Sequence, residues 1–214
     1  MTAMEFIEGP VWYAASAIFV LGIAWRIAAI FMIGRARDLS VSRRSPIVGA
    51  AKAVLLHSVP HGGNLGRTVY HFVTGYLFHI GLFALLLFAA PHVAFINAGI
   101  VALPWPAMPH WAFIIAAEAA FAGLILLYVR RLTDPVTRQL SDVDDHVGVW
   151  LTFVAMLTGC LALQEAHAGL RMLHMLSVEA LMIYFPFSRL THAFTFLLAR
   201  VNTGAALGRR GFTP

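Results

Sequence analysis

Histidine is the residue type in this chain whose number and placement point to chemistry. The sequence has ten histidines, and several of them fall within long apolar stretches. His71 and His79 share one such stretch, and His174 and His192 lie on another. Ionisable side chains inside membrane segments are functional candidates, and a neutral imidazole is a common axial ligand of haem iron. We therefore treat these four histidines as candidate ligands of iron.

The spacing within each pair suits helices that carry both side chains toward the interior of a bundle. At 100° per residue, His71 and His79 would lie about 80° apart around a helix. His174 and His192 would be separated by about five full turns, so that both project from one face, about 27 Å apart along the axis. Two bis-histidine haems, one toward each side of a bilayer, would explain this placement. An interhelical hydrogen bond is the alternative role for any single one of these residues.

The elements that must position these side chains are membrane helices. Hydrophobic residues make up 60% of the chain and charged residues only 12%, whereas a soluble domain is about one quarter charged. The length fits one domain over residues 1–214 with about five spans of roughly 20 residues. We expect an all-α, five-transmembrane-helix bundle with spans over residues 11–34, 67–91, 111–129, 147–163 and 173–199. We also expect an interfacial helix around 47–56 and a tail over 201–214.

Basic residues alternate between the expected loops. Residues 91–110, which follow the second span, contain no Lys or Arg. The loops after the first and third spans carry Arg35, Arg37, Arg43, Arg44, Lys52, Arg67, Arg130, Arg131 and Arg138. The positive-inside rule then predicts an outside N-terminus and a cytoplasmic C-terminus in a bacterial inner membrane. These loops explain the net charge of +5, and no nucleic acid is expected as a partner, because no basic patch is interleaved with aromatic residues.

This topology suggests how the histidines would pair. The start of the second span and the end of the fifth lie on the same, cytoplasmic side, so His71 and His192 could hold one haem. His79 and His174 lie further toward the outside and could hold the second. His92, which follows Pro91, is an alternative to His79.

The remaining candidates have simpler interpretations. Arg189 precedes His192 by about one helical turn, where it could pair with a haem propionate or extend to the membrane surface. The single cysteine, Cys160, excludes a disulfide or a cysteine-ligated iron–sulfur cluster within this chain. We expect the other histidines at the surface, on the outer side for His110 and His167 and on the cytoplasmic side for His57, His61 and His146.

Two segments at the fifth span resemble the cytochrome b (gamma) subunit of membrane-bound respiratory nitrate reductase. They are Arg171-Met172-Leu173-His174 and Tyr184-Phe185-Pro186-Phe187-Ser188-Arg189-Leu190-Thr191-His192. Two further stretches are similar to that family, Leu65-Gly66-Arg67-Thr68-Val69-Tyr70-His71 and Arg130-Arg131-Leu132-Thr133-Asp134-Pro135-Val136. The resemblance covers roughly residues 65–200. It implies that His71 and His192 hold the cytoplasmic haem b and that His79 and His174 hold the outer one.

The chain departs from the family pattern in two places. The family places the two histidines of its second span ten residues apart, whereas His71 and His79 are eight apart. A second register aligns the family pattern with Leu77-Phe78-His79-Ile80-Gly81 instead. In this register His79 binds the cytoplasmic haem. The outer haem is then bound by His92, or it is absent. The family also has a lysine at its quinol site, in the segment before the third span, and this chain has no lysine there. Leu103-Pro104 resemble part of that family segment. His110 is the ionisable residue close to them and could take the place of the lysine.

The function implied by the resemblance is quinol oxidation at the outer side, with electrons passing through two haems b. An iron–sulfur subunit and a catalytic subunit on the cytoplasmic face would receive them, and quinone and membrane lipid are the other expected partners. The chain would then be an electron-transfer subunit of an oxidoreductase complex. A mono- or dihaem subunit of a sulfur-metabolism or heterodisulfide-type complex is one alternative. A haem-free membrane anchor or a transporter is the other.

Overall fold

The computed structural model describes residues 1–32, 41–60, 63, 65–100, 105–163 and 167–212. Over these ranges the regular secondary structure is helical, without strands. Five helices are long and apolar enough to cross a membrane: Ala3–Met32, Leu65–Phe88, His110–Thr133, Val143–Ala162 and Ala168–Phe187. The expected all-helical class with five candidate spans is therefore confirmed, and it indicates a multi-pass membrane protein.

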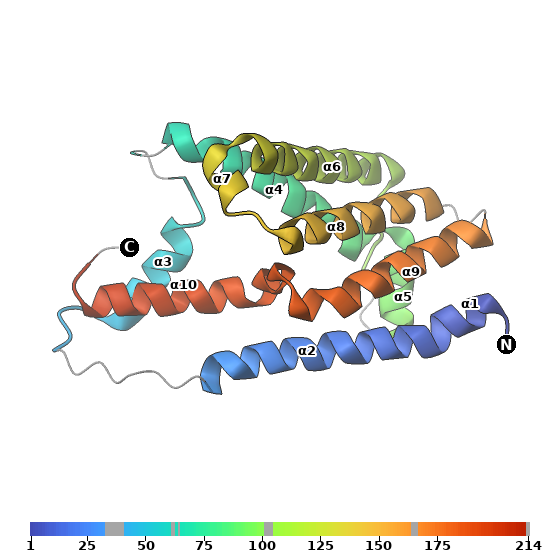
Figure 1. Cartoon of the computed structure of the whole chain (residues 1–214), viewed down its shortest axis with the longest axis horizontal. Coiled ribbons are helices and arrows are strands. Elements are labelled where there is room, and N and C mark those ends of the chain that lie inside the picture. Colours follow the sequence, from blue (N-terminus) through green and yellow to red (C-terminus); the bar gives the residue numbers. More distant parts are fainter. Residues whose placement is uncertain (33–40, 61–62, 64, 101–104, 164–166, 213–214) are drawn as a thin grey trace. The chain divides into compact units, whose positions relative to one another are not determined.

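Helix boundaries follow from local sequence signals. The first span joins α1 (Ala3–Phe6) through a π-helical turn (Ile7–Val11) to α2 (Trp12–Met32). The second, third and fourth spans are α4 (Leu65–Phe88), α6 (His110–Thr133) and α8 (Val143–Ala162), all visible in Figure 1. The shorter helices are α3 (Pro46–Leu56), α5 (Ala90–Gly99) and α7 (Pro135–Gln139), each with proline in its first turn. Proline is favoured there because the first N–H groups of a helix have no intrahelical acceptor. The helix expected around 47–56 is present as α3, and its place at the membrane interface stays a prediction.

The expectation of one continuous helix over 173–199 is wrong. The helix α9 (Ala168–Tyr184) ends in two 3₁₀ turns, Phe185–Phe187 and Arg189–Thr191, and α10 begins separately at His192 and runs to Arg209. Pro186 cannot donate a backbone hydrogen bond within a helix, and Ser188 is extended, with φ −110° and ψ 173°. We call residues 185–191 the helix break. Because His174 and His192 lie on different helices, the five-turn, same-face argument no longer applies to them. Residues 201–209, expected as a tail, continue α10.

The chain divides into two compact units, and each is described separately. The first comprises Met1–Glu8 and Tyr70–Leu181. Its core contains Leu85, Ala120, Leu124 and Met156. A Cβ added at Gly81 would lie 2.6 Å from the Ala116 carbonyl oxygen and 2.7 Å from the Ala120 nitrogen, so α4 and α6 approach closely through small residues, as is common in membrane bundles.

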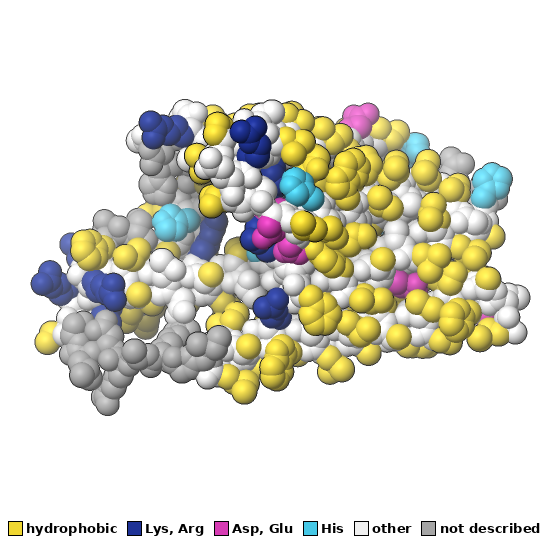
Figure 2. All heavy atoms as spheres, in the orientation of Figure 1, with side chains coloured by type: hydrophobic (Ala, Val, Ile, Leu, Met, Phe, Trp, Pro, Cys, Tyr) yellow, Lys and Arg dark blue, Asp and Glu magenta, His cyan; other side chains and the backbone are white. Residues whose placement is uncertain are grey.

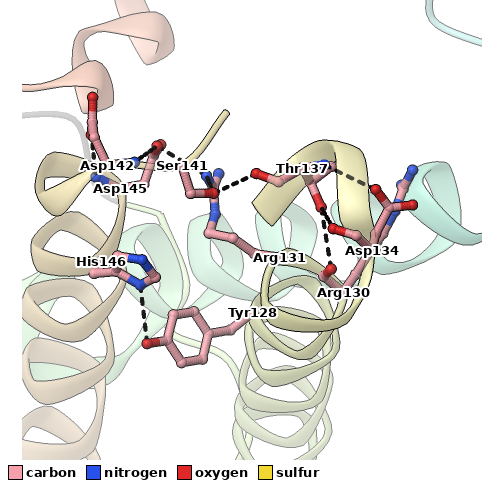
Figure 3. Close-up of polar contacts among 9 residues, drawn as sticks. All are labelled: Tyr128, Arg130, Arg131, Asp134, Thr137, Ser141, Asp142, Asp145 and His146. Carbon is pink, nitrogen blue, oxygen red and sulfur yellow. Dashed lines mark hydrogen bonds and ion pairs between the residues drawn. The ribbon is translucent and has the colours of Figure 1, made fainter. Parts of the chain in front are cut away.

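The connection from α6 through α7 to α8 is held by side-chain hydrogen bonds (Figure 3). Arg131 forms an ion pair with Asp145 at 3.0 Å and donates to the Ser141 hydroxyl at 2.8 Å. Asp134 caps α7 by accepting hydrogen bonds from the backbone N–H groups of Val136, at 3.0 Å, and Thr137, at 2.9 Å. The N–H of Thr137 is the largest cause that lowers the pKa of the Asp134 carboxyl.

The second unit comprises Gly9–Val69 and Met182–Pro214. Within it, α3 and α10 cross through small residues, because a Cβ on Gly49 would lie 2.7 Å from the Gly208 Cα. Gly204 and Gly208 are four residues apart and give α10 the small-residue spacing that permits close helix contact. The Arg43 backbone N–H donates to the Arg209 carbonyl at 2.9 Å, and Arg200 donates to the Ser58 hydroxyl at 3.0 Å. These contacts hold the two helices against each other.

Candidate functional site

His92 is oriented by the C-terminal end of α4. The last four carbonyl groups of an α-helix have no intrahelical donor. The His92 Nδ1 lies 3.1 Å from the carbonyl oxygens of both Leu85 and Leu86. Carbonyl oxygens only accept hydrogen bonds, so Nδ1 carries the proton and donates. The other ring nitrogen of His92, Nε2, then has the lone pair that a metal requires.

The same helix end is closed by neighbouring groups. The Trp105 indole N–H donates to the Leu87 carbonyl at 2.8 Å, and the Met108 backbone N–H donates to the Phe88 carbonyl at 2.9 Å. The Ala89 N–H also donates to the Leu85 carbonyl at 3.2 Å, so with His92 each of the last four carbonyls of α4 has a donor. The segment that follows α4 is thereby held against the helix, and His92 is held with it.

His174 is oriented by polar groups of α8 and of its own helix. Its Nδ1 lies 3.2 Å from the Thr158 hydroxyl, which in turn lies 2.8 Å from the Ser177 hydroxyl. Ser177 donates to the His174 carbonyl at 2.8 Å. Thr158 has one hydroxyl proton, and the Val154 carbonyl at 2.8 Å also accepts it. With that proton on Val154 or Ser177, the bond between Thr158 and His174 is donated by Nδ1. This network assigns the same tautomer to His174 as to His92.

Gly159 provides the space for the His174 ring. A Cβ at this position would lie 2.9 Å from Cε1 and 3.3 Å from Nδ1 of the imidazole. The imidazole therefore packs directly on the backbone of α8. A hydrogen bond on one side and a glycine surface on the other restrict the ring to one orientation.

The rings of His92 and His174 face the same region of the first unit. Their centroids are 6.0 Å apart, and their planes are inclined by only 18°. Offset aromatic ring pairs have centroids about 4.5–7 Å apart, and this pair lies within that range. Because each ring is hydrogen-bonded at Nδ1, Nε2 is the atom of each that could bind a metal. The two rings are therefore a candidate pair of ligands for one iron.

The structure also locates the other predicted ligands. His79, on α4, is half-buried, and its Nδ1 lies 2.7 Å from the Gly75 carbonyl oxygen. Its ring lies against Phe78, with centroids 4.7 Å apart. The ring parallel to His174 belongs to His92, which favours the register in which His92 is the partner of His174. His71 lies on α4 in the first unit, and His192 lies on α10 in the second.

His192 is placed by the helix break in the second unit. It is exposed and lies at the first position of α10, and its Nδ1 lies 2.9 Å from the Arg189 carbonyl oxygen. Arg189 itself is exposed, within the second 3₁₀ turn. Its predicted contact with a haem propionate remains a hypothesis.

One face of α2 receives the helix break. A Cβ on Gly22 would lie 2.5 Å from the Pro186 Cβ, and the Arg26 Nε donates to the Pro186 carbonyl at 2.8 Å. The Phe19 ring contacts the Phe185 ring, with centroids 5.3 Å apart. Arg26, which interrupts an apolar span in the sequence, thus supplies the donor that the broken helix lacks. These residues fix where α10 and His192 begin.

The five remaining histidines differ in position and exposure. His110 is exposed at the first position of α6, and His167 is exposed just before α9. His146, expected at the surface, lies instead within α8, half-buried, with Nδ1 3.2 Å from the Tyr128 hydroxyl (Figure 3). His57 caps the C-terminus of α3. His61, the Leu103–Pro104 pair and the loop residues Arg35 and Arg37 lie outside the described residues.

Glu179 is a candidate that the sequence reasoning missed. It lies on α9, five residues after His174, with only 2% of its surface exposed. Neither carboxylate oxygen has a hydrogen-bond partner within the described part of the chain. A buried polar group without a partner is costly, so its presence inside an apolar span makes Glu179 a functional candidate. The signal was available in the sequence, because it is the acidic residue within the stretch 168–187.

No cluster of three or more metal-ligating side chains occurs within the ranges that the structure describes. Two imidazoles suffice for the axial positions of a haem, because the porphyrin supplies the other four ligands.

No family model matches the chain. A protein of Nitratidesulfovibrio vulgaris is 27% identical over 222 residues, which cover 97% of this chain and 96% of the other. The name of that protein, "Protein", states no activity. The similarity therefore carries no function to this chain.

Proposed function

We propose that this chain is a membrane cytochrome b subunit that exchanges electrons with quinol, as in complexes similar to respiratory nitrate reductase. One observation carries the proposal. Two imidazoles within a five-span membrane protein have parallel rings 6.0 Å apart, and hydrogen bonds at Nδ1 leave Nε2 as the ligand atom of each.

The residues of the chain would do three things for a bound haem. His92 and His174 would hold the haem iron, each through Nε2. The Leu85, Leu86 and Thr158 acceptors would keep each ring oriented and raise the basicity of Nε2, as outer-shell acceptors do for metal-bound histidines. The haem would supply a one-electron iron couple, whose potential depends on such ligands and hydrogen bonds.

A second haem is part of the proposal. With His92 and His174 at the outer haem, the second register assigns His79 and His192 to the cytoplasmic one. In the first register that role belongs to His71 and His192. Both assignments use a histidine of α4 and the histidine that begins α10.

The proposed direction of transfer follows from the expected topology. Quinol would be oxidised near the outer haem, with His110 as the candidate ionisable residue, and would release two protons outside. An iron–sulfur subunit and a catalytic subunit would accept the electrons at the cytoplasmic face of a bacterial inner membrane. A partner from nitrate, sulfur-compound or heterodisulfide-type chemistry would satisfy this arrangement equally.

The test is a reduced-minus-oxidised visible spectrum of the purified protein, with the haem content determined per chain. We expect a b-type spectrum and two haems. The variants H92A and H174A should each retain one haem, and the double variant should also retain one, because both residues serve the same iron. H110A is the control and should retain two haems while quinol oxidation slows.

The same measurement separates the two registers. In the register that the structure favours, H71A retains two haems and H92A retains one. The reverse result would support the pairing of His79 with His174. Absence of any b-type signal in protein purified from its native membrane would overturn the proposal and leave a haem-free anchor as the better explanation.

A further inference from the structure

The third span contains a carboxylate on its outward side. Glu118 lies within α6 and is exposed. It forms no ion pair or hydrogen bond with any residue that the structure describes. Ionisable residues in membrane helices almost always face a bundle interior, a water-filled cavity or a partner group. An exposed carboxylate within the span therefore requires an explanation.

The position of Glu118 around α6 is opposite to the contact with α4. Ala120 packs against Gly81 of α4, and at 100° per residue Glu118 lies about 160° away from Ala120. The contact with α8 is made through Phe121, whose ring centroid lies 5.3 Å from that of Phe153. Both neighbouring helices of the first unit are thus accounted for without Glu118.

Other exposed residues share this side of α6. We define the α6 stripe as Ile115, Glu118, Ala122, Ile125 and Val129, all of which are exposed. They fall within about 80° of one another around the helix. Hydrophobic side chains cover much of the visible surface of α6 and α8 (Figure 2). The stripe is therefore apolar apart from one carboxylate, and Ala122, one turn from Glu118, would let another helix approach closely.

Glu118 also lies too deep for water to solvate it. It is eight residues after His110, the first residue of a helix of 24 residues, so it lies about 12 Å from that end of a helix about 36 Å long. If such a helix is centred in a hydrocarbon layer about 30 Å thick, Glu118 lies about 9 Å below the nearer boundary. A glutamate side chain does not span that distance.

We propose that the α6 stripe is the docking surface for a transmembrane helix of a partner subunit, which presents a Lys, Arg or His to Glu118. Charge complementarity is the argument. A carboxylate in hydrocarbon needs a cation or a donor, and an apolar helix with one basic residue at this depth supplies it. Apolar side chains of that helix would cover Ile115, Ile125 and Val129.

A second copy of this chain fits the surface less well. A twofold contact through the stripe places the same residue of each copy on the axis, which would bring two Glu118 carboxylates together. Like charges at such a contact oppose association. The proposal does not depend on haem, so its outcome is independent of the proposed function.

The first experiment places a photocrosslinking amino acid at Ala122 of the full chain in its native membrane and identifies the crosslinked peptide by mass spectrometry. The matched control is the same label at Ile80, an exposed position on α4. We expect the label at Ala122 to crosslink to a membrane helix of another protein, at a point within one turn of a basic residue. The label at Ile80 should not give this product. A crosslink only to lipid, to this chain, or to a helix without a basic residue would overturn the proposal.

The second experiment tests the charge. E118K should reduce the amount of that partner that copurifies by roughly tenfold or more, as loss of a desolvated charge pair does. Converting the partner's basic residue to Glu in the E118K background should restore it. E118L is the control for misfolding, because a leucine at this position is compatible with surrounding lipid. This variant should fold and still lose the partner. Retention of the partner by E118L, or no rescue by the exchanged charges, would refute the pairing.

Discussion

Replacing Gly159 by alanine tests whether the His174 ring must lie where the structure has it. The added Cβ would meet three ring atoms, Cε1 at 2.9 Å, Nδ1 at 3.3 Å and Nε2 at 3.4 Å. Carbon atoms in ordinary contact are about 3.5 Å or more apart, so the ring would have to move by about 0.6 Å. Metal–ligand distances tolerate only about 0.2 Å. We therefore expect G159A to lose most of the haem held by His174.

The cost to folding should be small by comparison. Overpacking of this kind costs about 1–3 kcal/mol, and alanine is favoured over glycine within a helix by about 1 kcal/mol. The net destabilisation should therefore lie between roughly 0 and 2 kcal/mol, which leaves a folded chain. Haem content should fall from two per chain toward one, while the amount of purified protein changes little.

The assay is haem content per chain with a reduced-minus-oxidised spectrum, and G75A is the matched control. Gly75 also lies within a membrane helix, but a Cβ there would meet nothing within 4 Å. G75A should keep two haems and be slightly more stable than the wild type. If G159A also keeps two haems with an unchanged spectrum, the inferred position of the His174 ring as a ligand is refuted.

Three further predictions concern single side chains. E179M removes a buried carboxyl without hydrogen-bond partners, so the thermal unfolding temperature in detergent should rise, corresponding to about 1–3 kcal/mol; a fall would reveal a stabilising partner. R26M removes the donor to the Pro186 carbonyl and should lower stability by about 1–3 kcal/mol, with Gly9→Ala, where a Cβ meets nothing within 4 Å, as the unaffected control. Because its backbone hydrogen bonds lower the pKa of Asp134, that carboxyl stabilises the fold above its ordinary pKa and loses this effect as the pH falls through the lowered value. Melting curves of D134A should therefore lie below those of the wild type at neutral pH and converge with them in acid; a constant difference would contradict the assigned cap.

Much of the fold could be predicted because membrane spans are encoded by long apolar runs. Each of the first four expected spans overlaps a helix of the structure, and the short helix Pro46–Leu56 was recognisable from its apolar residues and proline start. The fifth span could not be placed by hydropathy alone, because α10 is also rich in apolar residues. Pro186 was the available sign that the helix stops, and the extended conformation of Ser188 makes that stop complete.

The candidate site was harder to predict, because its pairing depends on where helices end. The expected topology suggested His79 as the partner of His174, because both lie further toward the outside on continuous spans, and that argument assumes that both ligands lie on regular helices. His92 lies on α5, after the chain has left α4, so no periodicity relates it to His174. Glu179 could have been found from the sequence as an acid within an apolar run. The absence of a hydrogen-bond partner for it required the structure.

Backbone carbonyls within reach of Nδ1 explain why particular histidines suit a metal. His92 donates from Nδ1 to the carbonyls of Leu85 and Leu86 at the end of α4, and His192 donates from Nδ1 to the Arg189 carbonyl beside the helix break. His79 makes the same contact with the Gly75 carbonyl inside α4, because a carbonyl that accepts one N–H has a second lone pair. Each acceptor fixes the tautomer and directs Nε2 away from the backbone. A carbonyl beside Nδ1 is therefore a physical reason for imidazole to serve as a ligand at these three positions, and spacing along one helix does not reveal it.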